Sequence, residues 1–84
     1  MSACPSQSFN NVSSDVFNCL VEKAASYGIN ISGNQGQGTK DGFTITWNYD
    51  PTAETLQLQC TDSPWWAPCS KINDTITEVV EGCM

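Results

Sequence analysis

Two runs of alternating apolar and polar residues dominate the hydrophobic pattern of the chain between positions 42 and 60. In the first run the apolar residues are Phe43, Ile45, Trp47 and Tyr49. In the second run they are Leu56, Leu58 and Cys60. Alternation with a period of two is typical of half-buried strands, and Asp50-Pro51 between the runs favours a turn. The pattern therefore predicts an antiparallel hairpin.

One pairing of these two runs brings their apolar faces together. If Tyr49 lies opposite Leu56, every apolar residue of the first run from Ile45 onward faces an apolar residue of the second. The same pairing leaves residues 51–54 as the connecting loop, and four residues is a common length for a hairpin loop. Because an isolated hairpin is marginally stable in water, we expect helices to cover its apolar face.

Apolar residues at helical spacing lie on both sides of the hairpin. The first stripe ends near Tyr27 and predicts a helix over residues 14–27, with Gly28 as the expected stop. The second stripe predicts a helix that begins at Cys69 or Ser70. The two stripes comprise Val16, Phe17, Leu20, Val21 and Ala24, and then Ile72, Ile76, Val79, Val80 and Cys83.

Three further segments carry weaker signals. Residues 1–12 are polar and contain Pro5, and we interpret them as a flexible N-terminal arm. Ile29 and Ile31 alternate with polar residues, as in a short strand. The glycine-rich run over residues 33–38 fits neither a phosphate-binding loop nor a dinucleotide fingerprint, so we interpret it as a loop.

These elements predict a small α+β fold with a single domain over residues 13–84. Its order is α-β-β-α, in which two helices pack on the aromatic face of the antiparallel hairpin. A chain of 84 residues has room for one domain with a modest core.

The charge of the chain limits its partners. It carries three lysines, no arginine and nine acidic residues, for a net charge of −6. Since nucleic-acid backbones are bound chiefly by clustered Lys and Arg, we expect no nucleic-acid partner. No apolar run is long enough to span a bilayer, so we expect no membrane insertion.

The residues that most often carry catalysis and bind metals are scarce. Histidine is absent, which removes Ser-His and Cys-His pairs and the commonest metal ligand. No two cysteines have the close spacing of a zinc site, so we predict neither a metal nor another cofactor. Cys69 is the best candidate nucleophile, because a helix start and the nearby Lys71 favour a thiolate. Without a base beside it, we expect no enzymatic activity.

Five cysteines leave at least one thiol unpaired in a monomer. Cys60 ends the second strand, and the proline-containing segment after it is able to bring Cys69 back towards it. These two residues are therefore candidates for a disulfide or for reactive thiols.

The sequence contains signals for two different cellular locations. The cysteine content and the Asn-X-Ser/Thr sequons at Asn11, Asn30 and Asn73 favour a secreted protein. No leader sequence with an apolar core precedes Cys4, which favours the cytoplasm unless a leader has been removed.

Two features indicate binding. Trp65 and Trp66 are adjacent between two prolines, so we expect one ring to pack into the core and the other to reach solvent as an anchor for a partner or a sugar. The second face of the hairpin is polar but uncharged, and it consists of Thr44, Thr46, Asn48, Gln57 and Gln59. These groups can hydrogen-bond a carbohydrate, and a hairpin edge without Lys or Pro is open to strand addition.

The sequence as a whole favours a small non-enzymatic interaction module that forms a homodimer or binds another protein. The alternative is a carbohydrate- or small-ligand-binding protein that uses exposed tryptophan and the Thr/Gln face. A thiol-dependent activity at Cys69 is the third hypothesis.

Overall fold

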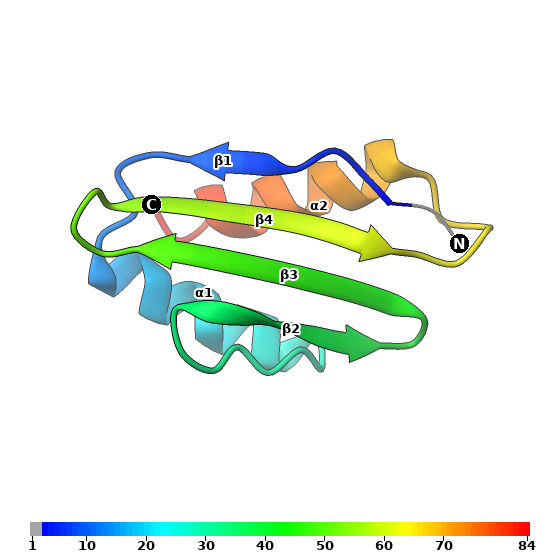
Figure 1. The fold of residues 1–84 in the computed structure, drawn as a ribbon, viewed down its shortest axis with the longest axis horizontal. Coiled ribbons are helices and arrows are strands. Elements are labelled where there is room, and N and C mark those ends of the chain that lie inside the picture. Colours follow the sequence, from blue (N-terminus) through cyan, green and yellow to red (C-terminus); the bar gives the residue numbers. More distant parts are fainter. Residues whose placement is uncertain (1–2) are drawn as a thin grey trace.

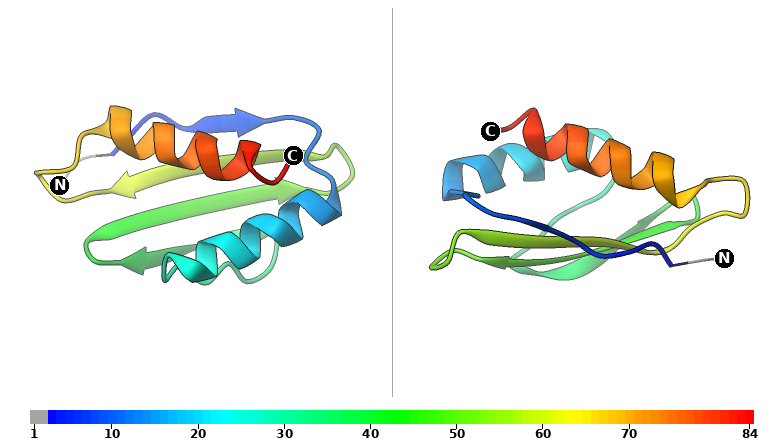
Figure 2. Two further views of the ribbon diagram at one scale, coloured as in Figure 1. Left: turned by 180° about the vertical axis from the view of Figure 1, so that it is seen from behind. Right: turned by 90° about the horizontal axis from the view of Figure 1, so that it is seen from above.

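Residues 3–84, the part of the chain described by the computed structural model, form a four-stranded antiparallel sheet with two helices on one of its faces (Figures 1 and 2). The elements in chain order are β1 (Gln7–Phe9), α1 (Ser14–Ser26), β2 (Gln35–Lys40), β3 (Phe43–Asp50), β4 (Thr55–Asp62) and α2 (Cys69–Glu81). The strand order across the sheet is β1-β4-β3-β2. The prediction of a small α+β domain is confirmed.

The hairpin of β3 and β4 forms in the predicted register, which includes the pairs Ile45–Cys60, Trp47–Leu58 and Tyr49–Leu56. Residues 51–54 make the turn. The carboxylate of Asp50 stabilises it by accepting hydrogen bonds from the backbone N–H groups of Thr52 and Ala53, at 3.0 and 3.2 Å. An Asp side chain that bonds its own following backbone is a common way to fix a turn.

Helix α1 begins and ends close to the predicted positions, and α2 begins at a predicted position. The Ser13 hydroxyl caps α1 by accepting a hydrogen bond from the N–H of Val16 at 3.3 Å. The chain leaves α1 through Gly28, whose φ of +87° is readily adopted by glycine. Helix α2 begins at Cys69, directly after Pro68.

The interpretation of the glycine-rich run as a loop is wrong, because Gln35–Lys40 forms strand β2. Gly36 lies opposite Trp47 of β3, and a Cβ atom at Gly36 would come within 2.8 Å of the indole ring. The indole N–H donates a hydrogen bond to the carbonyl of Gly33 at 3.3 Å. Glycine thus leaves room for the Trp47 ring beside β2, and the alternation rule misses such a strand because glycine has no side chain to alternate.

Two other expectations about irregular segments need correction. Residues 7–9, assigned from the sequence to a flexible arm, form β1 and pair with β4, while Met1 and Ser2 lie outside the described residues. Cys4 and Val12 on either side of β1 are 2% and 0% exposed. Ile29 and Ile31 lie half-buried in the connection between α1 and β2 rather than in a strand. Isolated apolar anchors of this kind produce no periodic signal.

The core lies between the helices and the sheet. Its fully buried members include Val12, Leu56 and Val80. The ring of Phe17 from α1 stacks on Tyr49 from β3, with centroids 4.2 Å apart. The buried Tyr49 hydroxyl donates a hydrogen bond to the carbonyl of Val12 at 2.8 Å, which satisfies its polar group.

Two disulfides in the described chain fasten the helices. Cys19–Cys83 joins α1 to the residue just beyond α2, and Cys4–Cys69 joins the segment before β1 to the first residue of α2. The candidate bridge between Cys60 and Cys69 is not formed. Cys60 is a buried free cysteine on β4, because the alternation that gives the hairpin its apolar face turns this residue into the core.

Candidate functional site

An apolar cleft of about 660 Å³ opens between α1 and α2, above the sheet. The two helices approach each other where α1 begins and α2 ends, and they diverge towards their other ends (Figure 2). The Cys19–Cys83 disulfide connects them on the converging side. The volume of the cleft lies within the range of about 300–1,000 Å³ that is typical of small-molecule sites.

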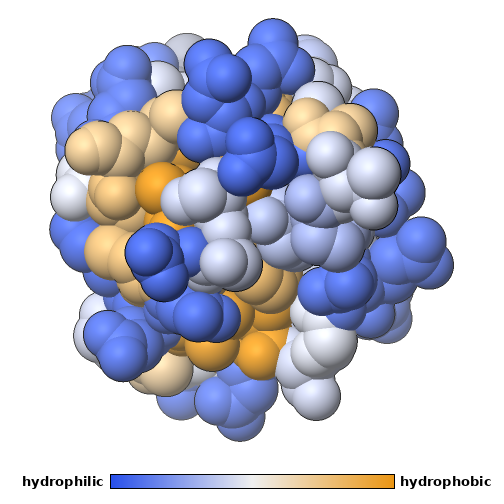
Figure 3. Space-filling view, turned by 90° about the vertical axis from the view of Figure 1, so that its left-hand side faces the viewer, coloured by the Kyte–Doolittle hydropathy of each residue, from blue (hydrophilic) through white to orange (hydrophobic). Residues whose placement is uncertain are grey.

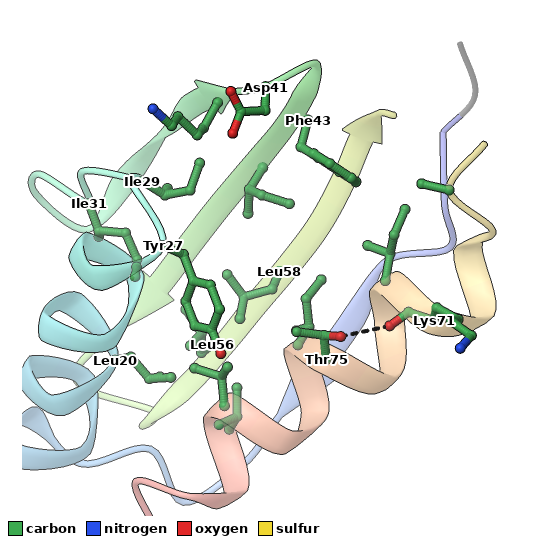
Figure 4. Close-up of a pocket in the computed structure, with 18 of the residues that line it drawn as sticks. Leu20, Tyr27, Ile29, Ile31, Asp41, Phe43, Leu56, Leu58, Lys71 and Thr75 are labelled. Carbon is green, nitrogen blue, oxygen red and sulfur yellow. Dashed lines mark hydrogen bonds between the residues drawn. The ribbon is translucent and has the colours of Figure 1, made fainter. Parts of the chain in front are cut away.

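Both helices and the sheet supply the lining. Helix α1 and the connection after it form one wall, α2 forms the other, and β3 and β4 form the floor. The apolar members include Leu20, Ala24, Ile29, Ile31, Ile45, Leu56, Leu58, Ile72, Ile76 and Val79. Figure 4 shows Leu20, Leu56 and Leu58 around the interior, with the Tyr27 ring reaching across it. At the end where the helices converge, apolar patches reach the surface among polar residues (Figure 3).

The charged residues that line the cleft, within the described part of the chain, are Lys40, Asp41 and Lys71. The aliphatic stem of Lys40 lies against Gly28, where a Cβ atom would come within 2.9 Å of its Cε atom. In Figure 4, the amine of Lys71 points away from the apolar interior, and Asp41 lies at the margin near Phe43. The cleft therefore combines an apolar interior with a charged margin.

Trp65 and Trp66 lie in a turn, and both rings reach solvent, with exposed fractions of 89% and 61%. The expectation that one ring would enter the core is wrong. The N–H of Ala67 bonds the carbonyl of Pro64 at 3.1 Å, and this turn buries Ala67 in place of an indole. Trp66 contacts Phe43 edge-on at 5.8 Å and lines the cleft. Only one of the two candidate tryptophans therefore belongs to the cleft.

The face of the sheet away from the helices holds the predicted polar residues, named here the open face: Thr44, Thr46, Asn48, Gln57 and Gln59. Asn48 and Gln57 are exposed, and the other three are half-buried. Strand β2 enlarges this face with side chains that the sequence did not assign to it: Gln35, Gln37 and Thr39.

Several open-face groups bond within the protein. Thr39 and Thr44 share a hydrogen bond of 3.1 Å across β2 and β3. The Thr46 hydroxyl donates to the carbonyl of Gln59, whose amide donates to the carbonyl of Cys4 at 2.8 Å. A polar depression of about 650 Å³ lies at one end of this face, lined by residues that include Ser8, Gln35, Asn48, Asp50 and Gln57.

The hairpin edges expected to be open to strand addition are covered. Strand β1 pairs with β4 and β2 pairs with β3, so both hairpin strands lie inside the sheet. The sheet instead ends at β1, which has three residues, and at β2, which has six. An additional strand would therefore have to join at β1 or β2.

Neither candidate cysteine offers an exposed thiolate. Cys69 is bonded to Cys4, so it carries no free thiol in this structure. Cys60 is fully buried and donates a hydrogen bond to the carbonyl of Asp62 at 3.1 Å. Burial raises the pKa of the Cys60 thiol, and this keeps it protonated.

Within residues 3–84, no group of three or more Cys, Asp or Glu side chains is placed to hold a metal ion. No helix in this range has the length and apolarity needed to cross a membrane. No protein-family model, curated protein or solved structure matches the chain.

The cleft itself was missed from the sequence, because its existence depends on how far apart the two helices lie. The available signal was an excess of apolar residues outside the predicted helices and hairpin, chiefly Ile29 and Ile31. Both line the cleft.

Proposed function

We propose that this protein binds a small apolar ligand in the cleft between α1 and α2 and catalyses no reaction. The observation that carries the proposal is an open space of about 660 Å³ with an almost entirely apolar lining, in a chain of 84 residues. Removing apolar surface from water is favourable by about 25 cal/mol for each Å². A ligand that covers this surface recovers that free energy on binding.

The two disulfides support the proposal because they hold the walls in place. Cys19–Cys83 ties the helices together on their converging side. Cys4–Cys69 ties the other end of α2 to the segment that precedes β1, the strand that lies farthest from β2. The wide end of α2 is therefore fastened beside β1, whereas α1 lies over the opposite side of the sheet (Figure 1). A cleft with fixed walls is pre-organised, which lowers the entropic cost of binding.

A neutral apolar dye such as Nile red tests the proposal by fluorescence titration. Ala24 lines the cleft from α1, so Ala24→Trp should fill part of it and weaken dye binding by about tenfold or more, since 1.4 kcal/mol is a factor of ten. Ala25→Trp is the matched control, because Ala25 is exposed on the same helix and is not part of the lining. Absence of dye binding to the unaltered protein, or equal binding by the two folded variants, would contradict the proposal.

Carbohydrate binding on the open face is a second candidate, supported by the polar depression there. Asn48 and Gln57 are exposed in it and present amide groups of the kind that bond sugar hydroxyls. A glycan panel should reveal binding that is lost in Asn48→Ala and Gln57→Ala but retained in Ala24→Trp. If no glycan binds, this second proposal fails without affecting the first.

Self-association is retained as a hypothesis, now at the edge of β2. This strand of six residues carries one charged residue, Lys40, at its end, and such edges are poorly protected against strand pairing. Light scattering at two concentrations should show a dimer that Gln37→Pro abolishes, because proline removes a backbone donor. A monomer at both concentrations would exclude the hypothesis.

A further inference from the structure

Charge is distributed unevenly between the cleft and the rest of the molecule. Of the chain's three lysines, two line the cleft, Lys40 and Lys71. Of its nine acidic residues, one does, Asp41. The lining is therefore locally cationic, although the whole chain has a net charge of −6.

The position of the two lysines matches the boundary between apolar surface and water. Lys40 ends β2, and its carbon stem packs against Gly28. Lys71 lies in the first turn of α2, with its amine directed out of the cleft (Figure 4). Long cationic side chains characteristically bury their stems and keep the ammonium group in water.

The first turn of α2 adds to the positive electrostatic potential of the two lysines. It contains no acidic residue, so the positive end of the helix dipole is not offset there. Helix dipoles favour an anion near the N-terminus of a helix. Both contributions act at the margin of the cleft rather than in its interior.

We infer that the occupant is an amphiphile with an anionic head, specifically a single long-chain carboxylate. This inference rests on the proposed function of the cleft. The hydrocarbon chain lies on the apolar floor formed by β3 and β4 and the facing helix residues. The carboxylate lies at the margin, beside one of the two lysines that line the cleft. The charge complementarity of the lining selects this head group over a neutral or cationic one.

Three ligands with the same chain and different heads test the inference: dodecanoate, dodecanol and dodecyltrimethylammonium. Calorimetric titrations at low salt and about pH 8, where lysine is charged and the carboxylate is ionised, compare them below their micelle concentrations. We expect dodecanoate to bind about two- to fivefold more tightly than dodecanol, because an exposed lysine beside the head group contributes up to about fivefold. The cationic ligand should bind more weakly than the alcohol despite the negative charge of the protein.

Substitutions of single charged residues show which of them contribute to dodecanoate binding. Lys40→Met and Lys71→Met keep an apolar stem, so both should leave dodecanol affinity unchanged. The variant at the lysine beside the head group should reduce dodecanoate affinity by about threefold. Lys23→Met is the matched control, because Lys23 loses the same charge but does not line the cleft. Asp41→Asn should raise dodecanoate affinity, because it removes the acidic group at the margin.

The outcomes separate the two proposals. If dodecanoate and dodecanol bind equally, the anionic head is excluded while the apolar site stands. If neither Lys40→Met nor Lys71→Met weakens dodecanoate binding more than Lys23→Met does, the effect belongs to net charge and the assignment to the cleft is overturned. If none of the three ligands binds, the proposed function itself fails.

Discussion

The two faces of the sheet differ in character although the same strands form them: one face is apolar and packs into the core, and the other is polar and faces solvent. On the helix side, Trp47 and Leu58 face each other and are buried. On the open face, Thr46 and Gln59 are direct neighbours, and their polar groups bond to backbone carbonyls. Neighbouring residues along a strand therefore face the core and the solvent in turn.

An apolar surface exposed to water is better evidence for a binding site than a polar surface. A polar open face needs no partner, because water satisfies its exposed groups at no cost. A broad apolar surface in contact with water is less usual in a soluble domain and commonly marks a binding site. The uncovered apolar part of the helix side is therefore stronger evidence for a ligand than the polar open face.

Trp47→Ala should give the largest loss of stability and sharpen the contrast between the faces. The ring is buried and fills the space above Gly36, so its removal should lower the free energy of unfolding by about 3–5 kcal/mol. Asn48→Ala, the next residue on the opposite face, should change it by less than about 0.5 kcal/mol. Urea unfolding of both variants checks this, and a loss below about 1 kcal/mol for Trp47→Ala would contradict the assignment of the core.

Removal of the bridge between Cys19 and Cys83 should give the next largest effect. The bridge spans 64 positions, and replacing both cysteines with alanine should lower the free energy of unfolding by about 2–4 kcal/mol. The Cys4–Cys69 bridge spans 65 positions, so its removal should cost a similar amount. Thermal unfolding of the two double variants tests this, and an unchanged melting temperature in either would show that its bridge does not stabilise the fold.

Gly36→Val should have an intermediate effect. A side chain at Gly36 would meet the Trp47 ring within 2.8 Å, so we expect overpacking to cost about 1–3 kcal/mol in urea unfolding. Gln37→Ala, one position along β2 and on the open face, is the control and should stay within about 0.5 kcal/mol. Equal stability of the two variants would argue against the close packing of the indole on β2.

The smallest effect should be a dependence of stability on pH. Burial raises the pKa of the Cys60 thiol and of the Tyr49 hydroxyl on the helix side. The unfolded chain therefore loses these protons at lower pH than the folded chain, and the stabilising effect is complete below pH 9.0, the ordinary value for the thiol. Stability should fall as the pH rises above this value, with a shallower fall in Cys60→Ala. A flat profile between pH 9.0 and pH 10.0 would contradict the Cys60 shift, and a flat profile above pH 10.0, the ordinary value for tyrosine, would contradict the Tyr49 shift.

The sequence by itself determined the elements whose residues repeat regularly. Alternation predicted β3 and β4 and, with the loop length, their register, because a shift by one residue would expose Trp47 and bury Asn48. Helical spacing and the stop at Gly28 predicted α1, and a second stripe predicted α2. The alternation along β3 and β4 also predicted the polar open face, because the polar residues between the apolar ones point to the opposite side of the sheet.

Only the tertiary structure decided the features that depend on contacts between distant segments. Strand β2 is recognisable only once Trp47 is seen beside Gly36, and β1 only once it lies along β4. The pairing of Cys69 with Cys4 rather than with Cys60 depends on the path of the whole chain. The cleft depends on the angle between two helices, and no local pattern encodes that angle, because it is set by packing across the sheet and by the disulfides that hold it.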